Sequence, residues 1–305
     1  MNKLDIAGRS KIWFAISTVI IVAGLICMFT RGFNFGIDFT GGTIIDLKFE
    51  RPVAIAEVRT SLAKFGLEGS QIQLTGAETG VTEAENVMIR TTDMEEEQRK
   101  EVMAAIKTDV ANYDVLREEK VGATIGGELI TNAVMALVVS WALIIAYVAY
   151  RFEWRFGVAA VLALVHDILI VLAVFSFTGR QIDSSFIAAL LTIVGYSIND
   201  TIVIFDRIRE NLKLHFRRGG DVVQLVNTSV FQTLTRSLYT VFTVMFTTFA
   251  LYFFGGETTK DFAFALLVGF GCGCYSSIFI ASPLWVALRK MGDKKKAAAN
   301  PAVAK

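Results

Sequence analysis

Six long apolar runs constrain the fold of this chain more than any other feature of its sequence. A transmembrane helix needs about 20 consecutive, predominantly apolar residues, and each run is near or above that length. With 53% hydrophobic residues, the chain is also too apolar for an ordinary soluble domain. We therefore predict a polytopic α-helical membrane protein with spans at Ile12–Phe29, Leu129–Tyr150, Gly157–Thr178, Ser184–Phe205, Ser237–Phe254 and Phe262–Leu288.

The first apolar run has the basic residues Lys3, Arg9 and Lys11 before it, as a secretory signal peptide would. No small-x-small cleavage site follows it cleanly, so we interpret it as a retained first helix. The stretch Val222–Thr235 has apolar residues at helical spacing and is either an interfacial helix or an extension of the fifth span.

Lysine and arginine are concentrated in alternate connections between the spans. The basic residues of the other short connections are only Arg180 and Lys260. Because basic residues mark the cytoplasmic side of a membrane protein, we predict that both termini are cytoplasmic. The predicted cytoplasmic residues are Lys3, Arg9, Lys11, Arg151, Arg155, Arg207, Arg209, Lys213, Arg217, Arg218 and the tail from Arg289 to Lys296.

This topology divides the chain into a cytoplasmic N-terminus with the first span (1–30), an extracytoplasmic segment (31–128), a bundle of the remaining spans (129–288) and a basic cytoplasmic tail (289–305). Lys294–Lys305 is expected to be disordered, because it is a short, polar chain end.

The extracytoplasmic segment has the pattern of a small α+β domain. Phe33–Thr40 alternates apolar and polar residues, and Gly41-Gly42 turns the chain into a second alternating run through Phe49. Strands near Gln71–Leu74 and Asn86–Thr91 and a last strand at Tyr113–Val121 are interleaved with helices. We predict that one helix is opened by Pro52 and closed by Gly66, and the other capped by Asp93 with Glu96. The resulting βαββαβ order is typical of a ferredoxin-like domain.

Charge and cysteine content exclude several classes of protein. Between Gly32 and Glu128 there are 18 acidic and 10 basic residues, which argues against nucleic acid as a partner. Cys27, Cys272 and Cys274 all lie within predicted spans, so we expect neither a disulfide framework nor a metal site. The Cys-x-Cys pair is interpreted as helix packing.

Asp200 is the most informative single residue, because it lies deep within the fourth apolar run. A carboxylate there costs about 2.5 kcal/mol or more on insertion scales, so such a group usually faces a bundle interior and has a function. Thr192, Tyr196 and Asp200 are one turn apart, Ser197 lies three residues before the aspartate, and Asn199 is next to it. Polar residues therefore form a stripe along this helix. The alternative to a functional role is a structural one, in which these residues form hydrogen bonds between packed helices.

Arg236, at the start of the fifth span, is the expected counter-ion for Asp200. Gln232, Arg236 and Thr240 are also spaced by four residues. The alternative is that Arg236 extends to the membrane interface, as arginine at a helix end commonly does.

His166 and Asp167 lie near the centre of the third span. Adjacent residues of a helix point about 100° apart, so we expect both to contact neighbouring helices without sharing one small site. They either take part in ion movement, because such groups bind and release protons near neutral pH, or form packing hydrogen bonds.

Small residues predict a close helix contact in the sixth span, where Gly269, Gly273 and Ser277 are spaced by four. In the extracytoplasmic segment, Asp38 is either a turn or strand-edge carboxylate or part of a site.

Several motifs read together resemble the SecF branch of the SecD/SecF family of bacterial protein-export membrane proteins, within the resistance-nodulation-division superfamily. The resemblance covers nearly the whole chain. It includes the outer-domain motif with Gly36, Asp38, Gly41 and Gly42. The motifs are Phe35-Gly36-Ile37-Asp38-Phe39-Thr40-Gly41-Gly42, Val165-His166-Asp167, Gly195-Tyr196-Ser197-Ile198-Asn199-Asp200-Thr201, Asp206-Arg207-Ile208-Arg209-Glu210-Asn211 and Thr233-Leu234-Thr235-Arg236.

The resemblance implies a non-enzymatic subunit of the bacterial cytoplasmic membrane that uses the proton motive force to promote late steps of protein translocation. Asp200 and Arg236 would form an ion relay with an aspartate of SecD. The implied partners are SecD in a heterodimer, the SecYEG translocon, accessory YajC, the translocating preprotein and the lipid bilayer. The coupling ion would be H⁺ or Na⁺, and no other cofactor is implied.

Two other functions are open from the sequence. An ion-driven exporter of small molecules or lipids in the same superfamily would usually have a duplicated, twelve-span chain. An intramembrane aspartyl protease would use Asp167 and Asp200 as a dyad that shares a proton. Against the protease, the Gly-x-Gly-Asp signature of that class is absent from the sequence.

Overall fold

The computed structural model describes residues 5–75, 82–215 and 220–299 of the chain. It consists of two compact units. One contains the long apolar helices, and the other comprises Phe35–Val134 together with the short segment Gln181–Ser184.

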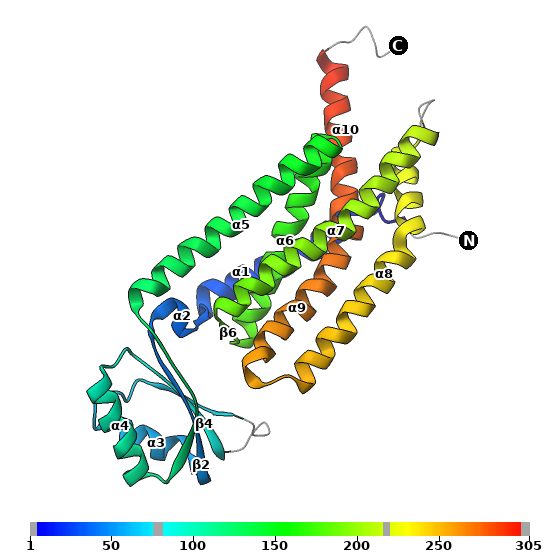
Figure 1. Ribbon diagram of the computed structural model, residues 1–305. Coiled ribbons are helices and arrows are strands. Elements are labelled where there is room, and N and C mark those ends of the chain that lie inside the picture. Colours follow the sequence, from blue (N-terminus) through cyan, green and yellow to red (C-terminus); the bar gives the residue numbers. More distant parts are fainter. Residues whose placement is uncertain (1–4, 76–81, 216–219, 300–305) are drawn as a thin grey trace. The chain divides into compact units, whose positions relative to one another are not determined.

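The first unit is a helical bundle (Figure 1). The described residues include six helices that are long and apolar enough to cross a membrane, as the sequence predicts. They are α1 (Ser10–Arg31), α5 (Ala123–Arg151), α6 (Trp154–Thr178), α7 (Ser184–His215), α8 (Val222–Phe254) and a last helix built of α9 (Glu257–Ser276), the π-helical turn η1 (Ser277–Ala281) and α10 (Ser282–Ala299).

Two of these helices are longer than the sequence indicates. Helix α8 begins at Val222, where the Asp221 carboxylate accepts a hydrogen bond of 2.9 Å from the Val223 amide, so Val222–Thr235 extends the fifth span. Helix α10 continues to Ala299, so the predicted disorder is wrong for residues 294–299, because the helix propagates beyond the apolar run. Residues 300–305, and the basic residues Lys3, Arg217 and Arg218, lie outside the described part of the chain.

Helices α6, α7 and α9 form the centre of the bundle, whereas α5 has no buried residues in its most apolar window. The small residues of α9 permit this centre to form. A Cβ atom at Gly269 would lie 2.2 Å from Ile193 of α7, and one at Gly273 would lie 3.0 Å from Ser197. The predicted close approach is therefore made between α9 and α7.

The second unit has the predicted βαββαβ order: β2 (Gly42–Ala54), α3 (Ile55–Ala63), β3 (Gln71–Thr75), β4 (Glu83–Thr91), α4 (Glu96–Asp109) and β5 (Tyr113–Val121). The antiparallel sheet has the order β3-β4-β2-β5, which is the ferredoxin-like arrangement. Its core is formed by alternate residues of β2 and β4 with one face of each helix. The buried residues include Ile45, Leu47, Phe49, Val58, Leu62, Val87, Ile89, Val102 and Ile106.

Local signals misplaced two helix starts. Helix α3 begins at Ile55 rather than Pro52, because Pro52 lies in β2 where the register with β4 shifts, a position that tolerates a residue without an amide hydrogen. Helix α4 is preceded by Glu95, and Asp93 forms an ion pair of 2.9 Å with Lys120 instead of capping the helix.

The predicted strand Phe33–Thr40 is also wrong for most of its length. Strand β1 contains only Asn34–Phe35, and Ile37–Thr40 form a single helical turn, α2. Strand β1 pairs with β6 (Gln181–Ile182), far away in the sequence, and the Gly36 amide donates to the Ile182 carbonyl across 2.7 Å. Alternation of apolar residues could not reveal this pairing.

Candidate functional site

Asp167 of α6 is fully buried and is contacted by side chains from two other helices. Its Oδ2 accepts hydrogen bonds from Ser197 of α7 at 2.7 Å and from Ser276 of α9 at 2.8 Å. Its Oδ1 lies 3.0 Å from Nδ1 of His166 and accepts from the Cys272 thiol at 3.3 Å. The carboxylate thus holds α6, α7 and α9 together.

His166 extends this network to the first helix. Its Nε2 lies 3.1 Å from Oγ of Ser17 in α1, and Ser17 lies 3.3 Å from the Tyr275 hydroxyl. Tyr275 donates in turn to the Trp13 carbonyl at 3.4 Å. A neutral imidazole has one donor and one acceptor nitrogen, so a proton on Nδ1 lets His166 donate to Asp167 and accept from Ser17.

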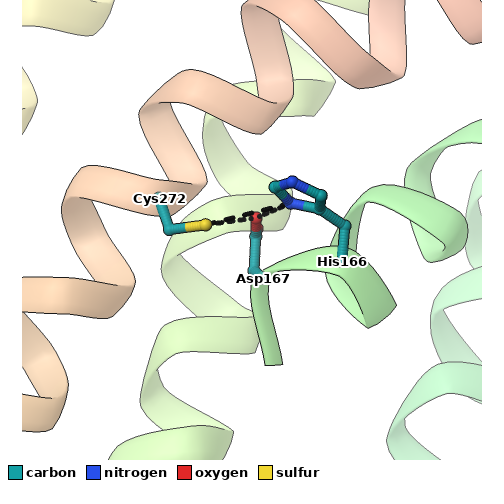
Figure 2. Close-up of side chains that lie close together, drawn as sticks. All are labelled: His166, Asp167 and Cys272. Atoms are coloured by element: carbon teal, nitrogen blue, oxygen red, sulfur yellow. Dashed lines mark hydrogen bonds and ion pairs between the residues drawn. The ribbon is translucent and has the colours of Figure 1, made fainter. Parts of the chain in front are cut away.

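The expectation that His166 and Asp167 do not share one small site is wrong. Figure 2 shows both side chains and Cys272 converging, with Asp167 between the imidazole and the thiol. Side-chain torsions bring the two groups together although their Cα–Cβ bonds diverge. Cys272 is the residue that sequence reasoning missed, since nothing in a Cys-x-Cys pair on an apolar helix indicates this contact.

The same three residues offer one imidazole nitrogen, one carboxylate oxygen and one sulfur, all within 4.8 Å of one another. These ligand types suit a transition metal such as zinc. However, both oxygens of Asp167 already accept hydrogen bonds from hydroxyl, thiol or imidazole groups. The buried cluster is therefore satisfied as a hydrogen-bonded network.

Asp200 of α7 is the second buried carboxylate, with a relative exposure of 7%. Its Oδ1 accepts a hydrogen bond of 2.5 Å from Ser237 of α8. Its other oxygen, Oδ2, is buried and has no hydrogen-bond partner among the described residues. A buried carboxylate oxygen without a partner is unfavourable, because its lost hydration is not replaced by a hydrogen bond.

Arg236, the expected counter-ion, adopts a different position. It is exposed, and in the described part of the chain it forms no ion pair within 4 Å of a carboxylate. The direct contact to Asp200 is made by Ser237, the next residue.

The two carboxylates are linked by adjacent residues of the last helix. Ser276 binds Asp167, and Ser277 lies 2.8 Å from Oγ1 of Thr201, the neighbour of Asp200. Ser277 also begins the π-helical turn η1, and the hydroxyl of Ser282, the first residue of α10, donates to the Ser277 carbonyl at 2.9 Å. Such turns are rare and frequently occur at functional sites.

The remaining predicted residues are distributed around this centre. Ser197 is buried and binds Asp167, the Tyr196 ring packs at a tilt of 52° against Phe270 with ring centroids 4.5 Å apart, and Asn199 is exposed. The motif residues Gly36, Asp38, Gly41 and Gly42 all belong to the second unit. There Asp38 lies in the single helical turn α2, and its carboxylate accepts a hydrogen bond from the Ser184 amide.

Comparison with known proteins shows to which family the chain belongs. The family model "Protein export membrane protein SecD/SecF, C-terminal" matches residues 101–291, and the "SecD/SecF GG Motif" model matches residues 28–53. A protein translocase subunit SecF from Acidaminococcus fermentans is 49% identical over 95% of this chain and 99% of its own length. A SecF subunit from Vibrio alginolyticus is 40% identical over 97% of this chain and 92% of its own length.

A fused relative has the same similarity over part of its length. The SecDF subunit of Thermus thermophilus is 42% identical over 91% of this chain, which spans 37% of that protein. The crystal structure of SecDF, a translocon-associated membrane protein from Thermus thermophilus, superimposes with a TM-score of 0.83 and 40% identity, covering 93% of this chain and 38% of that chain. The chain thus belongs to the SecD/SecF family of protein-export membrane proteins.

Proposed function

We propose that this chain is an accessory subunit of the protein translocase that uses the proton motive force to promote late steps of protein translocation and release. The observation that supports this most directly is the buried, unpaired Oδ2 of Asp200. The role is transport rather than catalysis.

The proposed cycle begins with binding of an ion to Asp200. A proton or Na⁺ at Oδ2 neutralises the carboxylate and weakens its short hydrogen bond to Ser237 of α8. Because α7 and α8 meet at that bond, loading and release of the ion let these helices shift against each other. The movement reaches the α+β domain, which engages the emerging preprotein.

A SecD-type subunit completes the relay. Relatives in which SecD and SecF form one chain support a heterodimer, since this chain spans 37% of the fused protein. Arg236 is exposed one residue from Ser237, so an aspartate supplied by SecD can pair with it and exchange the ion with Asp200. SecYEG and YajC are the further proposed partners.

We also propose a location in the bacterial cytoplasmic membrane with both termini in the cytoplasm. The asymmetry of lysine and arginine between the loops supports this orientation. It places the α+β domain on the side from which a translocated chain emerges.

The geometry favours this function over an intramembrane aspartyl protease. A protease dyad needs two carboxyl groups in contact so that they share a proton. Among the described residues, Asp167 and Asp200 form no hydrogen bond with each other, and each is bound by separate serines. Peptide cleavage by the purified protein should be nil.

The test is export driven by an imposed ion gradient in cells or vesicles with Asp200→Asn or Arg236→Met. Membrane abundance and copurification of the SecD-type partner are measured in parallel. The control is Asp293→Asn, an exposed carboxylate on α10. Loss of gradient-dependent export with assembly intact supports the relay; full export by Asp200→Asn rejects it, and loss of assembly makes these residues packing contacts. Replacing H⁺ by Na⁺ gradients identifies the ion.

A further inference from the structure

A cavity of about 400 Å³ lies within the helical bundle, between α1, α8 and the last helix. Helix α1 packs mainly on α6, and α8 packs mainly on α9, so α1 and α8 leave a space between them. The walls of the cavity are apolar and aromatic residues of these helices, of η1 and of the segment just before α1. Its volume is within the range of about 300–1,000 Å³ that is typical of ligand sites.

The cavity offers an apolar surface, because the polar groups of its aromatic side chains are already bonded. The Trp13 indole N–H donates to the Ile6 carbonyl at 3.1 Å. The Tyr275 hydroxyl donates to the Trp13 carbonyl at 3.4 Å and lies 3.3 Å from Oγ of Ser17. Phe279 packs against both rings, with centroid distances of 4.4 Å to Trp13 and 5.2 Å to Tyr275. Apolar cavities of this kind stay dry and bind apolar molecules.

The cavity opens at the lateral surface of the bundle. Leu238 of α8 is exposed, and Trp13, Tyr275 and Phe279 are only half-buried although they line the cavity. Because these helices are long and apolar enough to cross a membrane, their lateral surface faces hydrocarbon rather than water. The apolar molecules that reach such an opening are the acyl chains of membrane lipids.

Two basic residues lie at the end of the cavity where α1 begins. Arg9 immediately precedes α1, one helical turn before Trp13, and Lys11 is in the first turn of the helix. Both are exposed, and among the described residues neither forms an ion pair within 4 Å of a carboxylate. The Asp5 carboxylate at the same end accepts a hydrogen bond of 2.7 Å from the Asn227 side chain. The excess of positive charge complements a lipid phosphate.

We propose that this cavity, called here the lipid cavity, holds one acyl chain of an anionic phospholipid, and that Arg9 and Lys11 bind the phosphate of its headgroup. The chain fills the space between α1 and α8 and supports the aromatic wall formed by Trp13, Phe279 and Tyr275. This inference does not depend on the proposed function, because no part of it involves Asp200. The competing occupant is an apolar helix of a partner subunit, and the test distinguishes the two.

The test is photo-crosslinking of the purified full chain in phosphatidylcholine nanodiscs. The probe is a phosphatidylglycerol with a diazirine group on one acyl chain, and peptide mass spectrometry locates the labelled residues. We expect labelling within 231–241 of α8 and 271–279 of the last helix. A phosphatidylcholine probe with the same acyl chains measures the contribution of the headgroup.

Two variants fill the cavity from opposite walls. Gly271→Leu extends a side chain from α9, where a Cβ has nothing within 4 Å. Each buried methylene group contributes about fourfold to lipid binding, so this variant should lower labelling by about tenfold or more. Gly271→Ala adds a single methyl group and, as the matched control, should lower labelling by no more than about fourfold. Leu238→Phe fills the cavity from α8 and keeps the test decisive if Gly271→Leu does not fold.

The headgroup contact is tested separately. Arg9→Gln and Lys11→Gln should each lower labelling by the phosphatidylglycerol probe about fivefold, because a basic residue near an anionic headgroup contributes about that factor. Labelling by the phosphatidylcholine probe should not change. Lys290→Gln, at an exposed position of α10, is the matched control and should label like the wild-type protein.

The proposal is overturned if the cavity peptides are not labelled, if the folded filling variants label like the wild-type protein, or if both probes label equally. Loss of labelling when the SecD-type partner is copurified would show that a partner helix occupies the cavity, and overturns it too. Asp200→Asn leaves the lipid cavity intact and should label normally. Failure of the ion relay and failure of the lipid cavity are therefore distinguishable.

Discussion

The Ser237 hydroxyl donates a hydrogen bond of 2.5 Å to Asp200, and this bond joins α8 to α7 in the interior of the bundle. The contact differs from the ion pair that residue types suggest, because the arginine next to Ser237 is exposed. Oδ1 of the carboxylate therefore has a neutral partner, and Oδ2 is buried without a hydrogen bond among the described residues.

Ser237→Ala should reduce gradient-dependent export roughly tenfold, since a hydrogen bond to a charged group contributes about 1.5–3 kcal/mol. The measurement is export in vesicles with an imposed gradient. Ser237→Thr retains the hydroxyl and should retain most of the activity. Equal activity of the alanine and wild-type proteins would contradict a role for this bond.

Arg236→Met should leave the thermal stability of the purified subunit within about 0.5 kcal/mol of wild type, because exposed side chains contribute little to folding. The same variant should lose export while it still copurifies with the SecD-type partner. Arg236→Lys keeps the charge and is the control. A clear drop in the melting temperature of the isolated subunit would show that Arg236 acts within this chain.

Asp167→Asn and Asp200→Asn should differ in stability. The Asp167 carboxylate accepts hydrogen bonds from four donors. The amide of Asn at this position would direct its N–H group at some of these donors, so Asp167→Asn should lower the free energy of unfolding by about 1–3 kcal/mol. Asp200→Asn removes a buried, half-satisfied charge and should unfold at an equal or higher temperature while losing export. Thermal unfolding in detergent checks both; the reverse order would refute the assignment of roles.

Gly269→Ala should destabilise the bundle by about 1–3 kcal/mol, because the added methyl group meets Ile193 at 2.2 Å. Gly271→Ala is a matched control on the same helix, since a Cβ there has nothing within 4 Å. The comparison of the two melting temperatures isolates the steric effect from helix propensity. Equal changes would mean that α9 and α7 do not pack as closely as described.

The contribution of Asp46 in β2 to the stability of the α+β domain should be less favourable at neutral pH than at acid pH. Burial raises the pKa of its carboxyl group, opposed by the charges of Arg117 and Arg90. A raised pKa means that the ionised form is disfavoured in the folded state, so its cost is present above the folded pKa and disappears as the pH falls below it.

Asp46→Asn should therefore increase protection of β2 amides from hydrogen exchange at pH 7, with a smaller gain at acid pH. Asp114→Asn, an exposed position on the neighbouring strand β5, should leave the protection of β2 amides unchanged at both pH values. A gain of equal size at both pH values would show that ionisation of Asp46 is not responsible.

The apolar runs, the alternation in β2 and the spacing of small residues in α9 determine much of the architecture by themselves. Hydrophobic burial is set by local periodicity, so the membrane helices and the ferredoxin-like order follow from sequence. Buried polar residues such as Asp200, His166 and Asp167 were identifiable because a polar group in an apolar span is costly.

Only the tertiary structure decided which groups meet. Side-chain torsions and helix packing, which no spacing rule encodes, placed Cys272 and Ser276 on Asp167 and chose Ser237 rather than Arg236 as the contact of Asp200. The pairing of Asp38 with Ser184 joins residues 146 positions apart, and long-range contacts of this kind depend on the whole fold. Sequence thus determined the burial of the site residues, and packing determined their partners.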